Sequence, residues 1–395
     1  MVNPPRRILP TIIFSQFAGT SFWFAGNAVL PELSRLWGLS PDALAYMTSS
    51  VQLGFIVGTL VFAVLAISDI FSPRVVFLLC SLLGAAFNAG VYLVADGFAS
   101  LMVLRFLTGF FIAGIYPVGM KIAAGWYQRG LGKAIGYLVG ALVMGTAFPY
   151  LLKATGQSLS WPGVILSVSA TAVVGGFAMY VLVPDGPFLS KGAAFDPSAL
   201  KRVFQSRKFR SSAFGYFGHM WELYSFWAFV PVILAAHMGP GTVFRINIAL
   251  WAFLIIGAGS VGCAVGGVLS DRYGSARVAS TQLVVSGICC VVSPWMFSAP
   301  TALFLAFLLI WGITVVGDSP QFSALNALNA PQALVGSALT IVNCIGFSIT
   351  IVSLLLLSFA AHFVDTRWLF PMLALGPAAG LIAMRPLLGP QARPA

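Results

Sequence analysis

Residues 267–274 read Gly-Val-Leu-Ser-Asp-Arg-Tyr-Gly, a short charged turn between two long apolar runs of the chain. Each run has the length of about 20 residues with which an α-helix crosses the hydrocarbon core of a bilayer. The same alternation of apolar runs and polar turns continues outward in both directions and predicts twelve membrane spans. Their approximate ranges are 8–30, 44–67, 74–95, 98–122, 133–153, 161–183, 211–236, 246–269, 277–298, 301–325, 334–360 and 367–386.

The composition indicates a chain whose outer surface faces lipid. Only 8% of its 395 residues are charged and 59% are hydrophobic, whereas about a quarter of a soluble globular domain is charged. These values exclude a soluble domain, a disordered chain, a collagen and a disulfide scaffold. The predicted fold class is an all-α polytopic membrane protein, because a helix satisfies its own backbone in hydrocarbon. The five cysteines lie in apolar runs without C-x-x-C spacing, so we expect packing residues, with no metal site and no cofactor.

The basic residues predict an orientation across the membrane. If the N-terminus is cytoplasmic, the outer segments carry only Arg35, Lys153, Arg245 and Arg367, while Arg105 lies within a span. The other 16 of the 21 Lys and Arg residues fall in inner segments. We therefore expect both termini in the cytoplasm, in the inner (plasma) membrane of a bacterium, with an uncleaved first helix. The net charge of +11 is then a topology signal and argues against a nucleic-acid partner.

The longest polar stretch divides the spans into six and six. It covers residues 184–210, contains six basic residues and has a helical pattern at 197–203. We expect an N-terminal six-helix bundle at 1–183, a cytoplasmic linker at 184–210 and a C-terminal six-helix bundle at 211–395.

The two halves carry an internal repeat at an offset of about 200 residues. Ser68-Asp69 falls on Ser270-Asp271 at an offset of 202, and the prolines that we expect to close spans one and seven match at 200. A duplicated six-helix unit is typical of secondary transporters, which bind substrate near the midplane between their halves. The strongest match, at an offset of 203, is that of Gly109, Gly114 and Pro117 with Gly312, Gly317 and Pro320; the matched span-ending prolines are Pro31 and Pro231.

The quoted turn matches G-x-x-x-D-R-x-G, the loop motif of the major facilitator superfamily, at the position between spans eight and nine. Arg105 with Gly109 and Gly114 resembles the fourth-helix motif of that superfamily, and residues 130–136 resemble its usual start of helix five. The resemblance covers the whole chain and implies the superfamily fold of two six-helix bundles. Residues 218–224 are similar to bacterial nitrate/nitrite and cyanate porters, although the paired arginines of nitrate porters are absent from 44–67 and 246–269.

The resemblance also implies a conformational latch at the two loop motifs. The first-half copy keeps the aspartate but lacks both glycines and the first arginine. An aspartate at a helix end can pair with an arginine or with helix N-termini, and the alternative is an ordinary charged turn. The latch candidates are Asp69, Arg74, Gly267, Asp271, Arg272 and Gly274.

Four charged or histidine residues lie well inside predicted spans, away from the span ends, where such groups are costly and mark functional sites. His219 and Glu222 are three residues apart and share a face of span seven; proton coupling or substrate binding is one interpretation, and a hydrogen-bonded packing pair is the other. A metal site would need more ligands. Asp318 is a candidate proton carrier, a partner for a cation such as Lys121, or part of a salt bridge between bundles. For Arg105 the resemblance implies proton relay, and the alternative is packing against span one.

Aromatic and amide side chains of spans one, four and seven are candidates for lining a cavity, since they suit a small and partly polar ligand. An aromatic stripe is also common in ordinary core packing. The candidates are Gln16, Trp23, Asn27, Tyr116, Tyr216, Tyr224 and Trp227.

Together these features predict a secondary active transporter rather than an enzyme. No G-x-x-x-x-G-K-[ST] phosphate loop is present to use ATP. We expect alternating access, coupling to protons or another ion, and a small organic anion or polar metabolite as substrate. The expected partners are that substrate, the coupling ion and membrane lipid, and we expect a monomer. Efflux of hydrophobic compounds by proton antiport is the alternative, although the Gly-Pro motif of such antiporters is missing; a non-transporting sensor on the same fold is a further one.

Overall fold

The structure is a computed structural model that describes residues 4–127, 131–155, 159–189, 195–238 and 246–389. Gly130 of the predicted helix-five start and Arg245 of the outer segments lie outside these ranges. The described residues form helices and turns, with no strand among them. The helices are α1 (Ile8–Thr20), α2 (Ala25–Trp37), α3 (Ala43–Val64), α4 (Ile67–Ile70), α5 (Pro73–Leu93), α6 (Phe98–Ile112), α7 (Tyr116–Trp126), α8 (Leu131–Thr155), α9 (Trp161–Leu182), α10 (Ala199–Val203), α11 (Arg207–His237), α12 (Ile248–Tyr273), α13 (Ser275–Met296), α14 (Thr301–Gly317), α15 (Ser319–Asn329), α16 (Val335–Ala360) and α17 (Leu375–Leu388), with 3₁₀ turns at Gln332–Leu334, Thr366–Trp368 and Phe370–Ala374.

The predicted membrane spans are present as long helical stretches. Eleven stretches of the described residues are long and apolar enough to cross a membrane. The predicted seventh span is α11, a helix of 31 residues that begins at Arg207, four residues before the predicted start. The prediction of an all-α polytopic fold is therefore confirmed.

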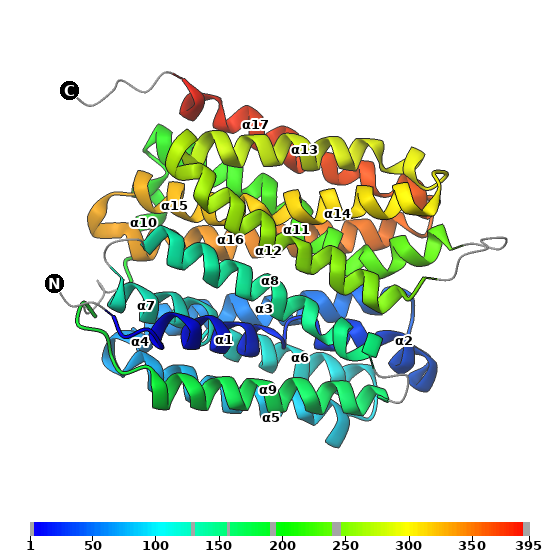
Figure 1. The fold of residues 1–395 in the computed structure, drawn as a ribbon, viewed down its shortest axis with the longest axis horizontal. Helices are drawn as coiled ribbons and strands as arrows, with labels where there is room; N and C mark the ends of the chain where they lie inside the picture. The colour runs from blue at the N-terminus through cyan, green and yellow to red at the C-terminus, as the bar shows by residue number, and fades with distance from the viewer. Residues whose placement is uncertain (1–3, 128–130, 156–158, 190–194, 239–245, 390–395) are drawn as a thin grey trace.

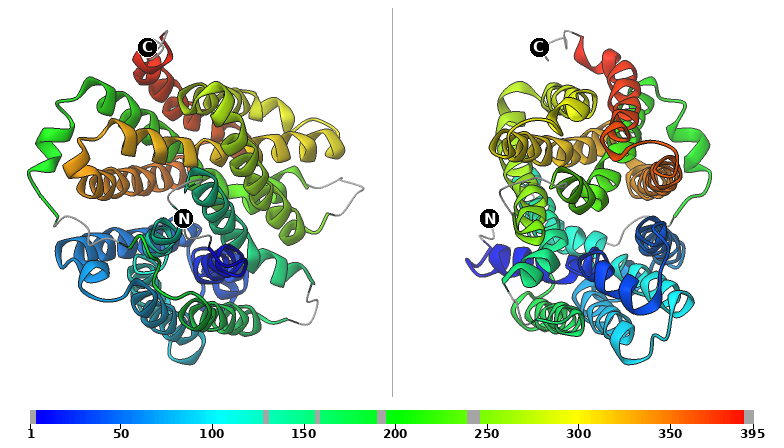
Figure 2. Two further views of the ribbon diagram at one scale, coloured as in Figure 1. Left: turned by 60° about the vertical axis from the view of Figure 1, so that its left-hand side comes forward. Right: turned by 90° about the vertical axis from the view of Figure 1, so that its right-hand side faces the viewer.

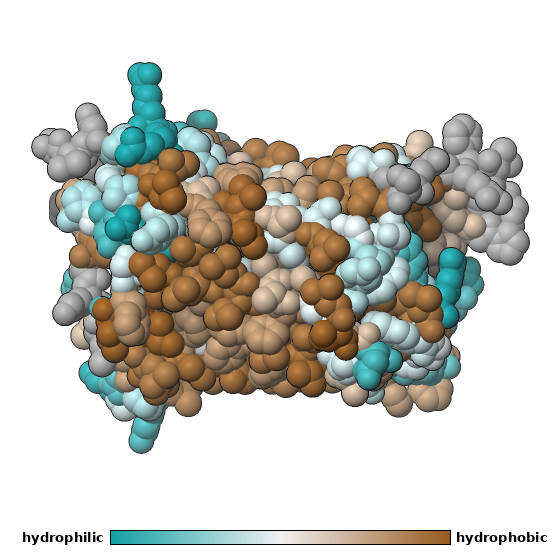
Figure 3. Space-filling view, turned by 90° about the horizontal axis from the view of Figure 1, so that it is seen from below, coloured by the Kyte–Doolittle hydropathy of each residue, from teal (hydrophilic) through white to brown (hydrophobic). Residues whose placement is uncertain are grey.

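The long helices run side by side along one axis, and both chain termini lie at the same end of the molecule (Figure 1). Helices α1–α9 gather on one side and α11–α17 on the other (Figure 2). Along the seam between them α3 packs on α16 and α8 packs on α12. On the face drawn in Figure 3, hydrophobic residues predominate over the middle of the molecule and the most hydrophilic residues lie towards its two ends. This distribution is the one that a lipid bilayer requires of a spanning protein.

Three of the predicted spans are interrupted near their middle. The first changes from α1 to α2 through the turn Ser21–Phe24, the fourth from α6 to α7, and the tenth from α14 to α15 at Asp318. Pro117 and Pro320 occupy the first turn of the new helix in spans four and ten, where a proline needs no hydrogen-bond donor. Interrupted helices are tolerated in a membrane where neighbouring groups satisfy the freed backbone.

The prediction that Pro31 and Pro231 close their spans is wrong. Both prolines lie inside helices, because α2 continues to Trp37 and α11 continues to His237. A proline inside a membrane helix is tolerated, since the surrounding helices and small local adjustments accommodate the missing hydrogen bond.

The repeated glycines of spans four and ten are points of close helix contact. A Cβ atom at Gly109 would collide with the backbone carbonyl of Val51 on α3, and a Cβ atom at Gly312 would collide with that of Ile255 on α12. The two residues that face the glycines are themselves 204 positions apart. The same helix packing is therefore built twice, once in each half of the chain.

We expect Gly109→Ala and Gly312→Ala each to destabilise the protein by about 1–3 kcal/mol, because the added methyl group forces two backbones apart. Thermal unfolding in detergent measures this effect. Gly336→Ala is the matched control, since nothing lies within 4 Å of a Cβ atom at Gly336. Equal unfolding temperatures for all three variants would contradict this account of the packing.

Candidate functional site

A cavity of about 600 Å³ lies between the two halves. Residues of the connecting segments at the terminus-bearing end line it, together with α3, α7 and α16. On its wall the Nζ of Lys121 lies 2.5 Å from an Asp69 oxygen and donates to the carbonyl of Ser68 at 2.6 Å. Thr59 and Thr340 line it from opposite sides of the seam. The cavity is thus open to polar solutes from one end of the molecule.

Beyond the cavity an aromatic layer closes the seam. Trp23 stacks against two rings of the other half, with its centroid 5.5 Å from Tyr224 and 5.5 Å from Phe347. Phe55 of α3 packs on Trp23 at 5.0 Å and on Phe347 at 4.7 Å. Phe55 is four residues from Thr59, and Phe347 is seven residues from Thr340, so the layer lies one to two helical turns beyond the cavity lining. We call Trp23, Phe55, Tyr224 and Phe347 the aromatic layer.

At the opposite end a polar contact joins the two halves. Asp42, just before α3, accepts a hydrogen bond from Ser358 Oγ at 2.7 Å, and His362 Nε2 lies 3.0 Å from the same carboxylate. These contacts, first the Ser358 hydroxyl and then the His362 ring, hold the pKa of the Asp42 carboxyl below its ordinary value. The seam is therefore open at the terminus-bearing end and closed at the other.

Arg105 holds the interrupted first span. Its side chain is fully buried, and Nη2 donates to the carbonyls of Phe22 at 2.6 Å and Trp23 at 3.1 Å. Nη1 donates to Asn88 Oδ1 at 2.8 Å, and Asn88 in turn donates to Ser169 on α9. Within the described part of the chain the guanidinium has no carboxylate partner. Arg105 therefore satisfies the backbone that the turn at 21–24 frees, and thereby fixes the position of the Trp23 ring.

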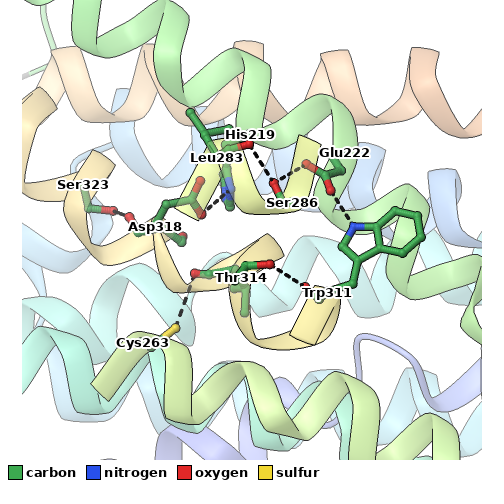
Figure 4. Close-up of polar contacts among 11 residues, drawn as sticks. His219, Glu222, Cys263, Leu283, Ser286, Trp311, Thr314, Asp318 and Ser323 are labelled. Atoms are coloured by element: carbon green, nitrogen blue, oxygen red, sulfur yellow. Dashed lines mark hydrogen bonds and ion pairs between the residues drawn. The ribbon is translucent and has the colours of Figure 1, made fainter. Parts of the chain in front are cut away.

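The second half contains a buried pair of ionisable groups. His219 Nδ1 on α11 lies 2.8 Å from Asp318 Oδ1, at the interruption of span ten (Figure 4). Both side chains are about 1% exposed. Among the residues that the structure describes, the other histidine nitrogen and the other carboxylate oxygen have no hydrogen-bond partner. The rings of Tyr216 and Phe322 lie 5.9 and 5.7 Å from the imidazole.

Glu222 lies on the same helix but has different partners. Its carboxylate accepts from Trp311 Nε1 at 2.6 Å, Ser286 Oγ at 2.9 Å and Cys290 Sγ at 3.2 Å (Figure 4). These donors belong to α13 and α14, so Glu222 is held inside the second bundle. His219 and Glu222 are neighbours on a helix face and yet engage separate groups. In the described residues no three His, Cys, Asp or Glu side chains are grouped to hold a metal ion.

The remaining cavity candidates lie near the seam at different levels. Gln16 donates to the carbonyl of Tyr116 at 3.4 Å, and Tyr216 donates to Asn343 at 3.2 Å. Asn27 donates to Thr48 at 2.8 Å, and Trp227 packs on Tyr224 with ring centroids 5.3 Å apart. Of the predicted set, the structure thus brings Trp23, Tyr224 and Trp227 into one cluster.

A family model described as Major Facilitator Superfamily matches residues 12–354. The chain belongs to the major facilitator superfamily. No curated protein matches the chain. Among solved structures, the human organic anion transporter MFSD10 (TETRAN) aligns with a TM-score of 0.73 over 97% of this chain and 100% of that chain, at 15% sequence identity. The likeness shows the superfamily fold, and the chain is an integral, multi-pass membrane protein of a transporter family.

The superfamily loop motifs have unequal partners in the two halves. Asp69 binds Lys121, so Lys121 is not the partner of Asp318. Arg74 instead approaches Asp185 of the linker at 3.9 Å and lies over the ring of Tyr180. In the second copy, Gly267 and Asp271 line a hollow between α8 and α12, Arg272 lies over the ring of Tyr273, and Gly274 has a φ of +84° that favours glycine.

Several residues of this superfamily member's site were not predicted. Phe55 and Phe347 are apolar residues in apolar spans, which gave no signal that they meet at the seam. The donors to Glu222 were missed as well, although Trp311 lies seven residues before Asp318 and so on the same face of span ten. Trp311 and Asp318 thus present one face of span ten to His219 and Glu222, which share a face of span seven.

We expect Arg105→Lys to destabilise the protein, because a compact ammonium cannot bond two carbonyls and Asn88 in one fork. The loss of one charge-assisted hydrogen bond corresponds to about 1.5–3 kcal/mol, measured by thermal unfolding. The control is Arg35→Lys, since Arg35 is exposed. If both variants unfold at the wild-type temperature, Arg105 does not hold the turn.

We expect Asp42→Asn to weaken the closed end of the seam by about 0.5–1 kcal/mol, as is usual for a partly exposed polar contact of a carboxylate. Gln52 is a buried residue of α3, the helix that packs on α16 along the seam. A thiol reagent should then label Gln52→Cys, in a background without native cysteines, roughly two- to fivefold faster. Because the Asp42 pKa is lowered, its contribution is complete above the ordinary carboxyl range and is lost as the pH falls through the lowered pKa.

Labelling of Gln52→Cys without the Asp42 substitution, divided by the labelling rate of an exposed reference cysteine at the same pH to cancel the loss of thiolate, should therefore also quicken on acidification. Asp365→Asn is the control for Asp42→Asn, since Asp365 is exposed at the same end. A labelling rate that responds equally to both substitutions would argue against a specific contact at Asp42.

Proposed function

We propose that the protein is a secondary active transporter that moves a small organic anion by alternating access, coupled to protons. The observation that carries the proposal is the seam between the halves, which holds a cavity at one end and is closed by the aromatic layer and Asp42 at the other. A rocking motion of two bundles about a central site needs this arrangement. The placement of Lys and Arg supports both termini in the cytoplasm, so the open cavity faces inward.

Cationic groups support an anion as the substrate. Lys121 lies on the cavity wall, where an entering anion can compete with Asp69 for the ammonium. Arg105 is a buried cation that meets only carbonyl and amide oxygens in the described residues. The printed activity of the structural neighbour, organic anion transport, agrees with this substrate class.

His219 and Asp318 are our candidates for the proton-coupling site. The pair is buried, lies where span ten is interrupted, and leaves one nitrogen and one oxygen unpartnered among the described residues. A proton can therefore be taken up or released without breaking an existing hydrogen bond. Glu222 is the weaker candidate, because three donors already hold its carboxylate.

The test is uptake of benzenesulfonate and cyclohexanesulfonate into proteoliposomes under an imposed pH gradient. A sulfonate stays ionised and carries no proton itself. Any proton that moves together with it must therefore be carried by the protein. We expect uptake above that of protein-free liposomes, with an acceleration by the gradient that Asp318→Asn and His219→Gln abolish while exchange at equal pH remains.

Two comparisons make this test decisive. Asp365→Asn, an exposed carboxylate, is the control and should leave the gradient response unchanged. Loss of the response in Glu222→Gln with its retention in Asp318→Asn would move the coupling site to Glu222. Absence of sulfonate uptake, together with proton-driven efflux of a hydrophobic dye, would favour the alternative of drug efflux.

A further inference from the structure

The aromatic layer joins the two halves of the molecule through stacked rings. Trp23 comes from the first half, is fully buried, and presents its ring face to Tyr224 and Phe347 of the second half, with interplanar angles of 28° and 24°. Such near-parallel stacks place one planar surface against another. Because Trp23 belongs to one bundle and both Tyr224 and Phe347 belong to the other, this face of Trp23 is uncovered whenever the bundles separate.

The layer and its neighbour Trp227, which packs on Tyr224, also hold hydrogen-bond donors that have no acceptor among the described residues. The indole N–H groups of Trp23 and Trp227 are buried without a partner in the part of the chain that the structure describes. A buried tryptophan N–H normally finds an acceptor. Two unpaired donors beside a stack of rings therefore indicate a surface prepared for a molecule with acceptor oxygens.

The layer lies next to the cavity, although its four rings are buried and do not line the cavity wall. Thr59 and Thr340 line the cavity, and Phe55 and Phe347 of the layer follow on the same two helices within one to two turns. Arg105 fixes the turn that carries Trp23, so the ring is held in place while its neighbours change. A solute that reaches the inner side of the layer meets a rigid indole face and two N–H donors nearby.

We infer that the aromatic layer is the binding site for the planar ring of a conjugated organic anion. The ring of the solute takes the place of Tyr224 and Phe347 on the face of Trp23, and its anionic oxygens accept from the Trp23 and Trp227 N–H groups. Residues Trp23 and Trp227 thus set a specificity for aromatic anions over saturated anions of equal charge and size. This inference rests on the proposed transport of organic anions.

The test compares benzenesulfonate with cyclohexanesulfonate, which have the same charge and similar size but differ in planarity. Each is used to compete with uptake of labelled benzenesulfonate in proteoliposomes. We expect the wild-type protein to prefer the aromatic anion roughly two- to tenfold, as expected for one offset aromatic stack. Trp23→Leu should remove the preference, and Trp23→Phe should keep part of it.

The control is Trp295→Leu, since Trp295 is 61% exposed on the outside of the molecule. The preference of the wild-type protein for benzenesulfonate over cyclohexanesulfonate is measured without any variant. The inference is therefore tested even if Trp23→Leu fails to fold. Equal competition by both anions, or a preference that survives Trp23→Leu, overturns the inference and leaves the transport proposal standing. Uptake of neither anion overturns both.

Discussion

The hydrogen bonds from Arg105 to the carbonyls of Phe22 and Trp23 determine the centre of this molecule. A turn in the middle of a membrane span exposes carbonyl groups that water cannot reach, and each would be costly to leave unbonded. A guanidinium is suited to this position because its planar fork serves several acceptors at once. Without Arg105 the turn would lose the side-chain donor of the Phe22 and Trp23 carbonyls, and the Trp23 ring would lose the contact that anchors its backbone.

The buried polar groups are bonded within their own halves, which allows the halves to move apart. Arg105 binds Asn88 in the first half, and His219 lies beside Asp318 in the second. The seam between them consists mainly of rings and aliphatic side chains, which lose no strong directional bonds when they separate. Asp42 and its partners add a polar contact at one end, where water is available to replace it.

The sequence predicted the spans and the ionisable groups within them, because both depend on local composition. It did not predict their partners, since these depend on how each helix is rotated and where it is interrupted. His219 and Glu222 share a face, yet one meets Asp318, at the break of span ten, and the other meets Trp311, seven residues earlier on α14. The turn at 21–24 contains no proline or glycine to mark it, and the tertiary contact with Arg105 that supports it joins residues more than 80 positions apart.

The two halves of the internal repeat share their close helix contacts but differ in their buried ionisable residues. Gly109 and Gly312 make equivalent helix contacts, whereas the position that matches Arg105 in the second half is Leu308, and the position that matches Asp318 in the first half is Ile115. The buried cation therefore belongs to one bundle and the acid with its histidine to the other. If anion binding and proton binding are divided in this way, the two events act on different bundles. Coupling between them must then pass through the contacts that join the bundles, which include the aromatic layer, the packing of α8 on α12 and the polar contact at Asp42.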